Sequence, residues 1–329
     1  MTRSFLAVVI LVSSALALDP NELRVVELHG KYGFINREGK MVIPARFDFA
    51  WDFSEGLASA WVGLPAASKA GFIDPRGEFV IPALFDYARA FHDGIAAVQV
   101  GGLWGFIDRT GHPIADAAFE AVDDFAEGLG AFKFEGKWGY LDKKGARAIS
   151  PKYDLTSGFS EGLAPVYLNQ KCGFIDKKGT IVVSANFERC AAFAEGLAAV
   201  KSGFWGYIDK VGIFQIKPHF DSAGVFSEGI AAIERRGRWG YVNRAGELIV
   251  EPEFFSPSGS PAAYRFSENK ACVKERVKWG FIDKKGKFVI AAKFVRGGTF
   301  NHGLARVCDA PNHCGYINDK GDYVWSGEP

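Results

Sequence analysis

The chain has 329 residues, 48% of them hydrophobic, so it is long enough to bury one large core or two medium ones. Its formal net charge is +1 and it contains no long basic run, which argues against a nucleic-acid partner. After the N-terminal region, no segment has the unbroken apolar run that a membrane-spanning helix requires.

The N-terminal residues have the three parts of a secretory signal peptide. Arg3 supplies a positive charge, Leu6 to Leu16 is almost wholly apolar but too short to span a bilayer, and Ala15-Leu16-Ala17 fits a small-x-small cleavage site. The alternative is a buried N-terminal strand. We therefore predict a signal peptide at 1–17 and a mature domain at 18–329. That domain is expected in the periplasm or outside the cell, with no membrane span after cleavage.

A short pattern then recurs along the rest of the chain. It reads WGFIDRTG at 104–111, KWGYLDKKG at 137–145 and WGFIDKKG at 279–286. Aligning the pattern on its first glycine gives nine copies, spaced by 33 to 40 residues. The aligned glycines are Gly33, Gly71, Gly105, Gly139, Gly173, Gly206, Gly240, Gly280 and Gly315. A fixed period of this length is typical of a tandem-repeat architecture.

Each copy continues into a tight turn. An Asp or Asn follows the aromatic and aliphatic residues of the pattern, and a glycine stands three residues later: Gly39, Gly77, Gly111, Gly145, Gly179, Gly212, Gly246, Gly286 and Gly321. The Asp or Asn side chain can accept hydrogen bonds from nearby amides, and glycine accepts a positive φ, so the segment predicts a hairpin turn. A calcium loop is the alternative, but one carboxylate per loop supplies too few ligands.

Two further elements complete the unit. A short strand ending at Pro, as in VIPARFD (42–48), follows the turn. An FSEGLA-like element, as at 53–58, then leads into the next strand. No long helical periodicity is present. Each unit therefore predicts a three-stranded meander, and both faces of its middle strand are apolar, so neighbouring units must stack to cover them.

The combination of Trp-Gly, aromatic-aliphatic-Asp, DxxG turn and FSEGLA element resembles the WG-repeat family, a bacterial β-repeat family. The resemblance covers residues from about 24 to 325. It implies a repeat scaffold without a catalytic activity that could be transferred. Tyr32, Ala70, Cys172 and Cys314 replace the tryptophan in four copies, and the family tryptophan is present in the other five: Trp104, Trp138, Trp205, Trp239 and Trp279.

For the overall arrangement we expect an all-β array of nine three-stranded units, as an elongated or curved solenoid rather than a closed β-propeller. The period is short beside a typical propeller blade of about 40–45 residues, and nine exceeds the usual four to eight blades. In addition, Leu23 to Leu28 already supplies the first unit's leading strand, and Tyr323 to Trp325 supplies the last unit's final strand. No strand is left to close a ring by exchange between the termini.

The recurring aromatics have two interpretations. They form an interlocking core, which is our expectation, or they form a platform that stacks on ligands. Trp51, Trp61 and Tyr264 lie outside the repeated Trp position and are the candidates for binding. Two inserts, Trp61 to Ser68 and Phe255 to Tyr264, are the expected sites of specificity, because insertions in repeats often map to a binding face.

An acidic residue recurs in the FSEGLA element: Glu55, Asp93, Glu127, Glu161, Glu195, Glu228 and Glu268, with His302 in the last copy. A row of carboxylates could bind cations or a basic partner. We expect instead that each carboxylate accepts amide hydrogen bonds in the turn beside it.

Five cysteines are present, and Cys308 and Cys314 flank a short loop where a disulfide is expected in an oxidising compartment. Burial of the others is the default expectation. We find no metal-ligand spacing, no catalytic motif and no cofactor motif. The predicted function is therefore a non-enzymatic scaffold that binds a protein or an envelope component. The alternatives are carbohydrate or cell-wall binding through exposed aromatics and, more distantly, a hydrolase carried by an insert.

Overall fold

The computed structural model describes residues 19–64, 67–255 and 261–327. The predicted signal peptide and residues 256–260 of the second insert lie outside the described residues. The described chain begins with one short 3₁₀ helix, η1 (Pro20–Glu22), and continues entirely in strands. No helix in this part of the chain has the length and apolar character needed to cross a membrane.

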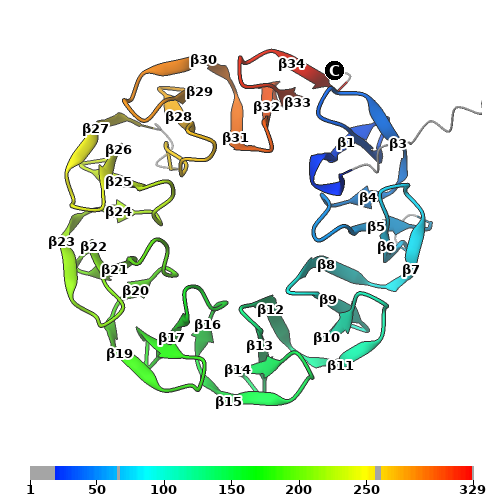
Figure 1. Ribbon diagram of the computed structural model, residues 1–329, viewed down its shortest axis with the longest axis horizontal. Coiled ribbons are helices and arrows are strands. Elements are labelled where there is room, and N and C mark those ends of the chain that lie inside the picture. The colour runs from blue at the N-terminus through cyan, green and yellow to red at the C-terminus, as the bar shows by residue number, and fades with distance from the viewer. Residues whose placement is uncertain (1–18, 65–66, 256–260, 328–329) are drawn as a thin grey trace, which may run out of the picture.

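The strands form nine small antiparallel sheets arranged as the blades of a closed ring (Figure 1). Seven sheets have four strands and two have three, and every blade is made from one continuous stretch of chain. The protein is thus a nine-bladed β-propeller. The predicted all-β class and the nine units are confirmed, whereas the predicted open solenoid of three-stranded units is wrong. The strand that the sequence interpretation missed is a short innermost one.

Within a blade the strands follow one another from the ring centre outwards, and we call them inner, second, third and outer. In the part of the chain that the structure describes, the first blade has no inner strand and contains β1 (Arg24–Leu28), β2 (Lys31–Ile35) and β3 (Met41–Phe47). The second contains β4 (Phe49–Ala50), β5 (Ala58–Val62), β6 (Lys69–Ile73) and β7 (Phe79–Phe85). The third contains β8 (Tyr87–His92), β9 (Ile95–Val100), β10 (Leu103–Asp108) and β11 (Pro113–Phe119). The fourth contains β12 (Ala121–Ala126), β13 (Leu129–Phe134), β14 (Lys137–Asp142) and β15 (Arg147–Tyr153).

The remaining five blades repeat this order. The fifth contains β16 (Leu155–Thr156), β17 (Leu163–Leu168), β18 (Lys171–Asp176) and β19 (Ile181–Phe187). The sixth contains β20 (Arg189–Cys190), β21 (Ala198–Ser202), β22 (Phe204–Ile208) and β23 (Phe214–Phe220). The seventh contains β24 (Ser222–Ala223), β25 (Ile230–Arg235), β26 (Arg238–Asn243) and β27 (Leu248–Phe254). The eighth contains β28 (Ala271–Glu275), β29 (Lys278–Ile282) and β30 (Phe288–Phe294), and the ninth β31 (Arg296–Asn301), β32 (Leu304–Ala310), β33 (His313–Ile317) and β34 (Tyr323–Ser326).

The glycine of the repeated pattern is required by a bulge in the outer strand. In the fourth blade Trp138 pairs with Tyr153 and Tyr140 with Ile149, so the outer strand places extra residues opposite Gly139. A Cβ on Gly139 would lie 2.5 Å from the carbonyl oxygen of Ile149. That distance is too short for any side chain, so only glycine allows the bulged strand to approach.

Aromatic pairs join one blade to the next. The residue after the pattern glycine, such as Phe174 in the fifth blade, packs against the aromatic residue of the FSEGLA element in the next blade, here Phe193, with ring centroids 4.8 Å apart. Both rings are almost fully buried. The same pairing recurs as Phe34–Phe53, Phe72–Phe91, Phe106–Phe125, Tyr140–Phe159, Tyr207–Phe226, Tyr241–Phe266 and Phe281–Phe300. These pairs are the repeating core of the ring.

The ring closes where the ninth blade meets the first, and we call this junction the seam (Figure 1). The first and last strands lie where the sequence predicts them, but closure needs no strand exchange. Val26, Ile35, Leu304 and Tyr316 form a shared apolar cluster instead. The hydroxyl of Tyr316 donates to the carbonyl of Val25 at 3.2 Å. Side-chain packing and side-chain hydrogen bonds, without strand pairing, therefore join the first blade to the ninth.

Candidate functional site

The family tryptophans lie at the edges of the inter-blade core. Trp239 and Trp279 are 8% exposed, whereas Trp104, Trp138 and Trp205 are half-buried. Trp279 packs against Tyr264 of its own blade, with ring centroids 5.1 Å apart, and its Cβ lies beside Gly297 of the next blade. The tryptophans thus cover the junctions, while the most deeply buried aromatics are the residues two positions later.

The glycines of the DxxG turns all adopt a positive φ, between 78° and 90°. In the fourth blade the amide of Gly145 donates to the carbonyl of Asp142 at 3.0 Å. The Asp142 carboxylate accepts from the amides of Lys144 and Ala146, both at 2.9 Å. The other eight turns share this geometry at Gly39, Gly77, Gly111, Gly179, Gly212, Gly246, Gly286 and Gly321. The turn carboxylates are therefore occupied by their own backbone.

The acid of the FSEGLA element links neighbouring blades rather than capping its own turn. The carboxylate of Glu161 in the fifth blade accepts the amide of Gly196 in the sixth at 3.0 Å. Equivalent bonds run from Gly94 to Glu55, Gly128 to Asp93, Gly162 to Glu127, Gly229 to Glu195, Asn269 to Glu228 and Gly303 to Glu268. The expected amide acceptor role is right in kind, but the amide belongs to the next blade.

A basic residue of the next blade's DxxG turn completes most of these links. Lys177 lies 3.0 Å from the carboxylate of Glu127, and Lys210 lies 3.2 Å from that of Glu161. Burial would raise the pKa of Glu127, but hydrogen bonds from Lys177 and from the Gly162 amide outweigh it and lower the pKa. In the sequence, the acid and the base of each ion pair stand about 50 residues apart, in different repeats. Aligning the repeats with one another therefore does not reveal the pair.

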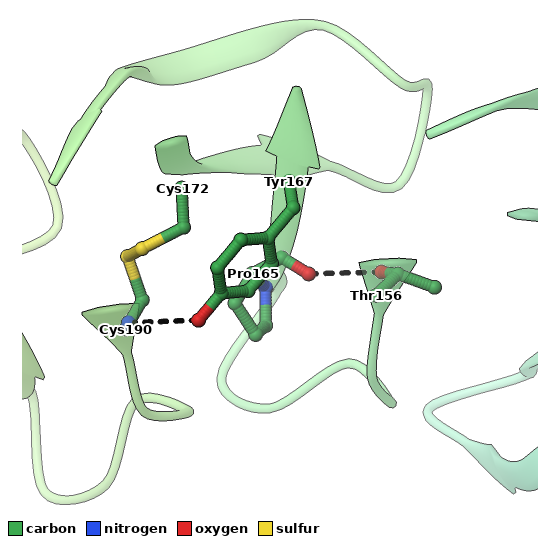
Figure 2. Close-up of a disulfide and its surroundings, with 5 residues drawn as sticks. All are labelled: Thr156, Pro165, Tyr167, Cys172 and Cys190. Carbon is green, nitrogen blue, oxygen red and sulfur yellow. Dashed lines mark hydrogen bonds between the residues drawn. A yellow bond between two sulfur atoms is a disulfide. The ribbon is translucent and has the colours of Figure 1, made fainter. Parts of the chain in front are cut away.

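Two disulfides connect four of the cysteines. One joins Cys308 to Cys314 across β32 and β33. The other joins Cys172 of the fifth blade to Cys190 on the inner strand of the sixth (Figure 2). Figure 2 also shows the hydroxyl of Tyr167 accepting the amide of Cys190 at 3.4 Å. Cys172 stands at the Trp position, so a covalent bond replaces the tryptophan contact with the next blade. Cys272 is buried and reduced.

The three aromatics outside the Trp position have different environments. Trp61 is only 6% exposed and pairs across the sheet with Ala70, which occupies the Trp position in the second blade. It fills the space that the missing tryptophan would occupy, so its predicted role in ligand binding does not fit its burial. Tyr264 is 42% exposed and its ring packs on Trp279. Trp51 is 46% exposed and lies in a cavity.

This cavity, which we call the inner-strand pocket, spans residues of the second, third and fourth blades and has a volume of about 410 Å³. It is lined by residues 51–54, Tyr87, Arg89, Ala90 and Asp124. Trp51 follows the inner strand β4, Tyr87 and Arg89 lie on β8, and Asp124 lies on β12. Sequence reasoning missed Tyr87, Arg89 and Asp124, because they occupy inner-strand positions where the repeats differ from one another.

Charges of both signs lie in the inner-strand pocket. The guanidinium of Arg89 lies 5.1 Å from the centre of the Trp104 ring and 3.6 Å from the carboxylate of Asp124. Burial raises the pKa of Asp124, although Arg89 opposes the shift. One oxygen of Asp124 has no hydrogen-bond partner among the described residues. That oxygen is itself buried, so the pocket offers a ligand exposed ring surfaces and a positioned cation.

In the described part of the chain, no group of three or more His, Cys, Asp or Glu side chains is placed to hold a metal ion. Neither insert contributes a described residue to the inner-strand pocket. The first insert forms the connection between β5 and β6, where Leu64 is exposed.

Comparisons with known proteins agree with the fold. The chain resembles a crystal structure titled as the eukaryotic initiation factor, with a TM-score of 0.62 and 9% identity over 92% of this chain and 94% of that one. It also resembles dihydro-heme d1 dehydrogenase NirN, with a TM-score of 0.51 and 12% identity over 95% of this chain and 74% of that one. BamB from Moraxella catarrhalis matches with a TM-score of 0.45 and 12% identity, over 74% and 83% of the two chains. At these identities the likeness shows the fold alone. No curated protein sequence matches the chain.

The family comparison is more specific. The model described as the WG containing repeat matches eight successive segments: 32–60, 71–104, 104–138, 138–172, 173–203, 205–239, 239–278 and 279–309. Together these cover most of the chain and confirm the resemblance inferred from the Trp-Gly, DxxG and FSEGLA elements. The chain belongs to the WG-repeat family.

Proposed function

We propose that the protein is an exported, non-enzymatic scaffold that binds a protein or envelope component through the inner-strand pocket. The observation that carries this proposal is the exposure of Trp51 and Tyr87 around one cavity together with Arg89. Tryptophan, tyrosine and arginine are the residues that most often dominate binding energy at protein interfaces. Here they come from two blades and do not follow the repeat, although Tyr87 also packs on Trp61 of the second blade and Arg89 faces the carboxylates of the fourth.

The charges of the pocket favour a ligand with polar groups. The guanidinium of Arg89 stacks on the Trp104 ring. It also lies near the carboxylates of Asp123 and Asp124, which orient its N–H groups. A neutral acceptor such as a backbone carbonyl could bind Arg89 without adding negative charge beside Asp123 and Asp124, and the arginine is already ordered. A segment of a partner protein provides both such groups and apolar side chains for Trp51.

Export is supported by the cysteines as well as by the N-terminal residues. Cys172–Cys190 and Cys308–Cys314 are both joined. Structural disulfides persist mainly in oxidising compartments such as the periplasm or the cell exterior. The predicted cleavage after Ala17 would place the mature domain there.

Carbohydrate binding is the second candidate, because Trp51 and Tyr87 are 46% and 37% exposed. Exposed aromatic ring faces beside carboxylates suit a sugar ring, which stacks through its C–H groups and donates through its hydroxyls. An enzyme carried by an insert has less support, since the described residues of the first insert include no His, Cys, Asp or Glu.

The experiment compares ligand capture by the wild-type chain with capture by Trp51→Ala and Arg89→Ala. Envelope proteins and a panel of envelope glycans are presented separately, and bound material is identified by mass spectrometry. Tyr264→Ala is the matched control, since Tyr264 is also an exposed aromatic but lies outside the pocket. Loss of one protein partner in both pocket variants and not in the control supports the proposal. Equal capture by all variants contradicts it. Saturable glycan binding that depends on Trp51 establishes the second candidate instead.

A further inference from the structure

Among the described residues, no strand pairs with the inner edge of the first blade, whereas the same edge is filled in every other blade. In the fourth blade, Lys133 lies opposite Trp138 on the neighbouring strand. Its carbonyl accepts the amide of Glu120, the residue just before the inner strand, at 3.1 Å. The eighth blade makes the equivalent ladder through Ala262, whose carbonyl accepts the amide of Lys274 at 2.7 Å. In the first blade the equivalent residue is Glu27, opposite Tyr32. Among the described residues, no hydrogen bond reaches the main chain of Glu27.

The direction of these groups follows from the register of β1. The two-residue turn His29–Gly30 makes Leu28 and Lys31 a hydrogen-bonded pair, so the main-chain groups of Val25 and Glu27 point away from β2. Val25 confirms this, because its amide donates to Asp52 at 2.8 Å and its carbonyl accepts from Tyr316. Side chains thus replace a strand at Val25, while Glu27 presents an unpaired N–H and C=O.

A cavity of about 490 Å³ lies along this edge. Its other wall belongs to the ninth blade and includes Arg296, Arg306, Asn312, Tyr316 and Trp325. We call it the seam groove. Arg296 and Arg306 are exposed and make no hydrogen bond or ion pair with described residues. The carboxylate of Glu27 is engaged by the hydroxyl of Tyr32 at 3.2 Å. The groove therefore combines an open strand edge with two arginines that form no ion pair among the described residues, although the carboxylates of Glu27 and Asp52 lie in their neighbourhood.

We propose that the seam groove binds an extended segment of a partner protein that carries an acidic side chain. The segment pairs with β1 as an added inner strand, so its main chain bonds to the N–H and C=O of Glu27. Its carboxylate binds Arg306 or Arg296, and its apolar side chains pack on Tyr316 and Trp325. The groove shares no lining residue with the inner-strand pocket, although Asp52 of that pocket accepts the Val25 amide at the groove's edge. The proposal does not require that pocket to bind a ligand.

The chain's own N-terminal segment fits the groove less well. Residues 1–17 contain no Asp or Glu and carry the single charge of Arg3, so they cannot neutralise the two arginines. After the predicted cleavage, only Leu18 and Asp19 would precede η1, too few residues for a strand. At the other end, Gly327 is already bonded to Cys314. A partner segment is therefore the occupant with matching length and charge.

The test uses a displayed library of random peptides of about seven residues, the length of a typical added strand. The library is selected on the purified full chain and on the chain that begins at Leu18. Recovered peptides should be enriched in Asp and Glu and depleted in Pro. Their binding should weaken about tenfold or more in Arg306→Glu and Arg296→Glu, because a charge pair is lost and a repulsion is added.

Two further variants make the result specific to the groove. In a capped variant, a copy of residues 120–128 is placed directly before Leu23. These residues form the inner strand and turn of the fourth blade, and Leu23 is the position equivalent to Leu129. It should lose peptide binding while keeping the fold. Trp51→Ala, in the inner-strand pocket, should bind the peptides normally. The proposal is overturned by the recovery of no peptides, by peptides that the capped variant still binds, or by binding indifferent to both arginine changes. Binding only after removal of residues 1–17 would assign the groove to the chain's own segment and also overturn it.

Discussion

The seam and an ordinary junction of the ring use the same surfaces but different contacts. Between the fifth and sixth blades, the Phe174–Phe193 pair, the Glu161–Gly196 bond and the Cys172–Cys190 disulfide all cross the junction. At the seam, the described residues include no equivalent of the aromatic partner, of the carboxylate or of the inner strand. Tyr316 bonds Val25 instead, and Arg24 donates to the carbonyl of Asn301 at 3.1 Å.

Some ordinary contacts survive at the seam, such as that of Gly39 with Val324 of the ninth blade, which matches the contact of Gly145 with Ile114. The guanidinium of Arg37, in the first blade's DxxG turn, lies beside Gly303 of the ninth blade, as the equivalent arginine Arg244 lies beside Gly196. The ring is therefore closed by the outer part of the blade interface, while the inner part is left open. This difference explains why closure and an accessible strand edge occur at the same junction. We therefore expect the seam to be less stabilised than an ordinary junction.

The largest effect is expected for an aromatic residue of an ordinary junction. Phe174→Ala should lower the free energy of unfolding by about 3–5 kcal/mol, because it removes a fully buried ring and leaves a cavity. At the seam, Tyr316→Phe removes only the hydroxyl bond and should cost about 1 kcal/mol. Chemical denaturation measures both. A larger cost for Tyr316→Phe would show that the seam is not the weaker junction.

The disulfides should rank by the length of chain that each encloses. Replacing Cys172 and Cys190 by Ser opens a loop of 18 residues and should cost about 3 kcal/mol. Replacing Cys308 and Cys314 by Ser opens a loop of 6 residues and should cost about 2 kcal/mol. Thermal unfolding of both double variants tests the ranking. The reverse order would mean that the bridge within the ninth blade supports the seam more than its loop length indicates.

The inter-blade carboxylates should make the ordinary junctions sensitive to acid. The pKa of Glu127 is lowered in the folded state, so its contribution is complete above its usual pKa of 4.5 and is lost as the pH falls through the folded value. Glu127→Gln should cost about 1 kcal/mol at neutral pH and little at low pH. Glu135→Gln is the control, since Glu135 is exposed and has no partner among the described residues. A cost for Glu127→Gln that does not change with pH would contradict this role.

The smallest effect is expected for His302, which takes the acid's place at the seam. His302→Glu should change stability by no more than about 0.5 kcal/mol, because Arg37 is nearby but the equivalent amide in the first blade, that of Glu22, already donates to the carbonyl of Asp19. A gain as large as the loss in Glu127→Gln would show that this amide is available to the new carboxylate. The same denaturation series measures it.

Much of the fold could be predicted from the sequence, because its turns and most of its strands are determined by residues close together in the chain. The Asp142 to Gly145 turn and the Pro-terminated strands need only their own residues, and the repeat gives their number. The inner strands were missed since most are short and carry no alternation, as in Phe49–Ala50. Closure was missed because it depends on the angle between stacked blades, to which many contacts contribute. The absence of a spare strand was correct, but it did not exclude a ring closed by packing.

The candidate sites were harder to predict for a related reason. Trp51 was accessible to sequence reasoning because it departs from the repeat, but Trp61 departs from it too and only compensates for Ala70. To distinguish an exposed tryptophan from a buried one, it is necessary to know which residue lies opposite each of them in the sheet. The seam groove depends on residues nearly 300 positions apart, such as Val25 and Tyr316, and on a strand that is missing rather than on one that is present.

Ring closure is tested most directly by a distance across the seam. Spin labels at Lys31→Cys in the first blade and Asn312→Cys in the ninth report it by pulsed electron paramagnetic resonance. Labels at Glu135→Cys and Lys171→Cys, in the equivalent turns of the fourth and fifth blades, provide the matched ordinary junction. A closed ring predicts one narrow distance at the seam, similar to that of the control pair. A long or broad distribution at the seam, with a narrow one at the control, would contradict the closed nine-bladed propeller.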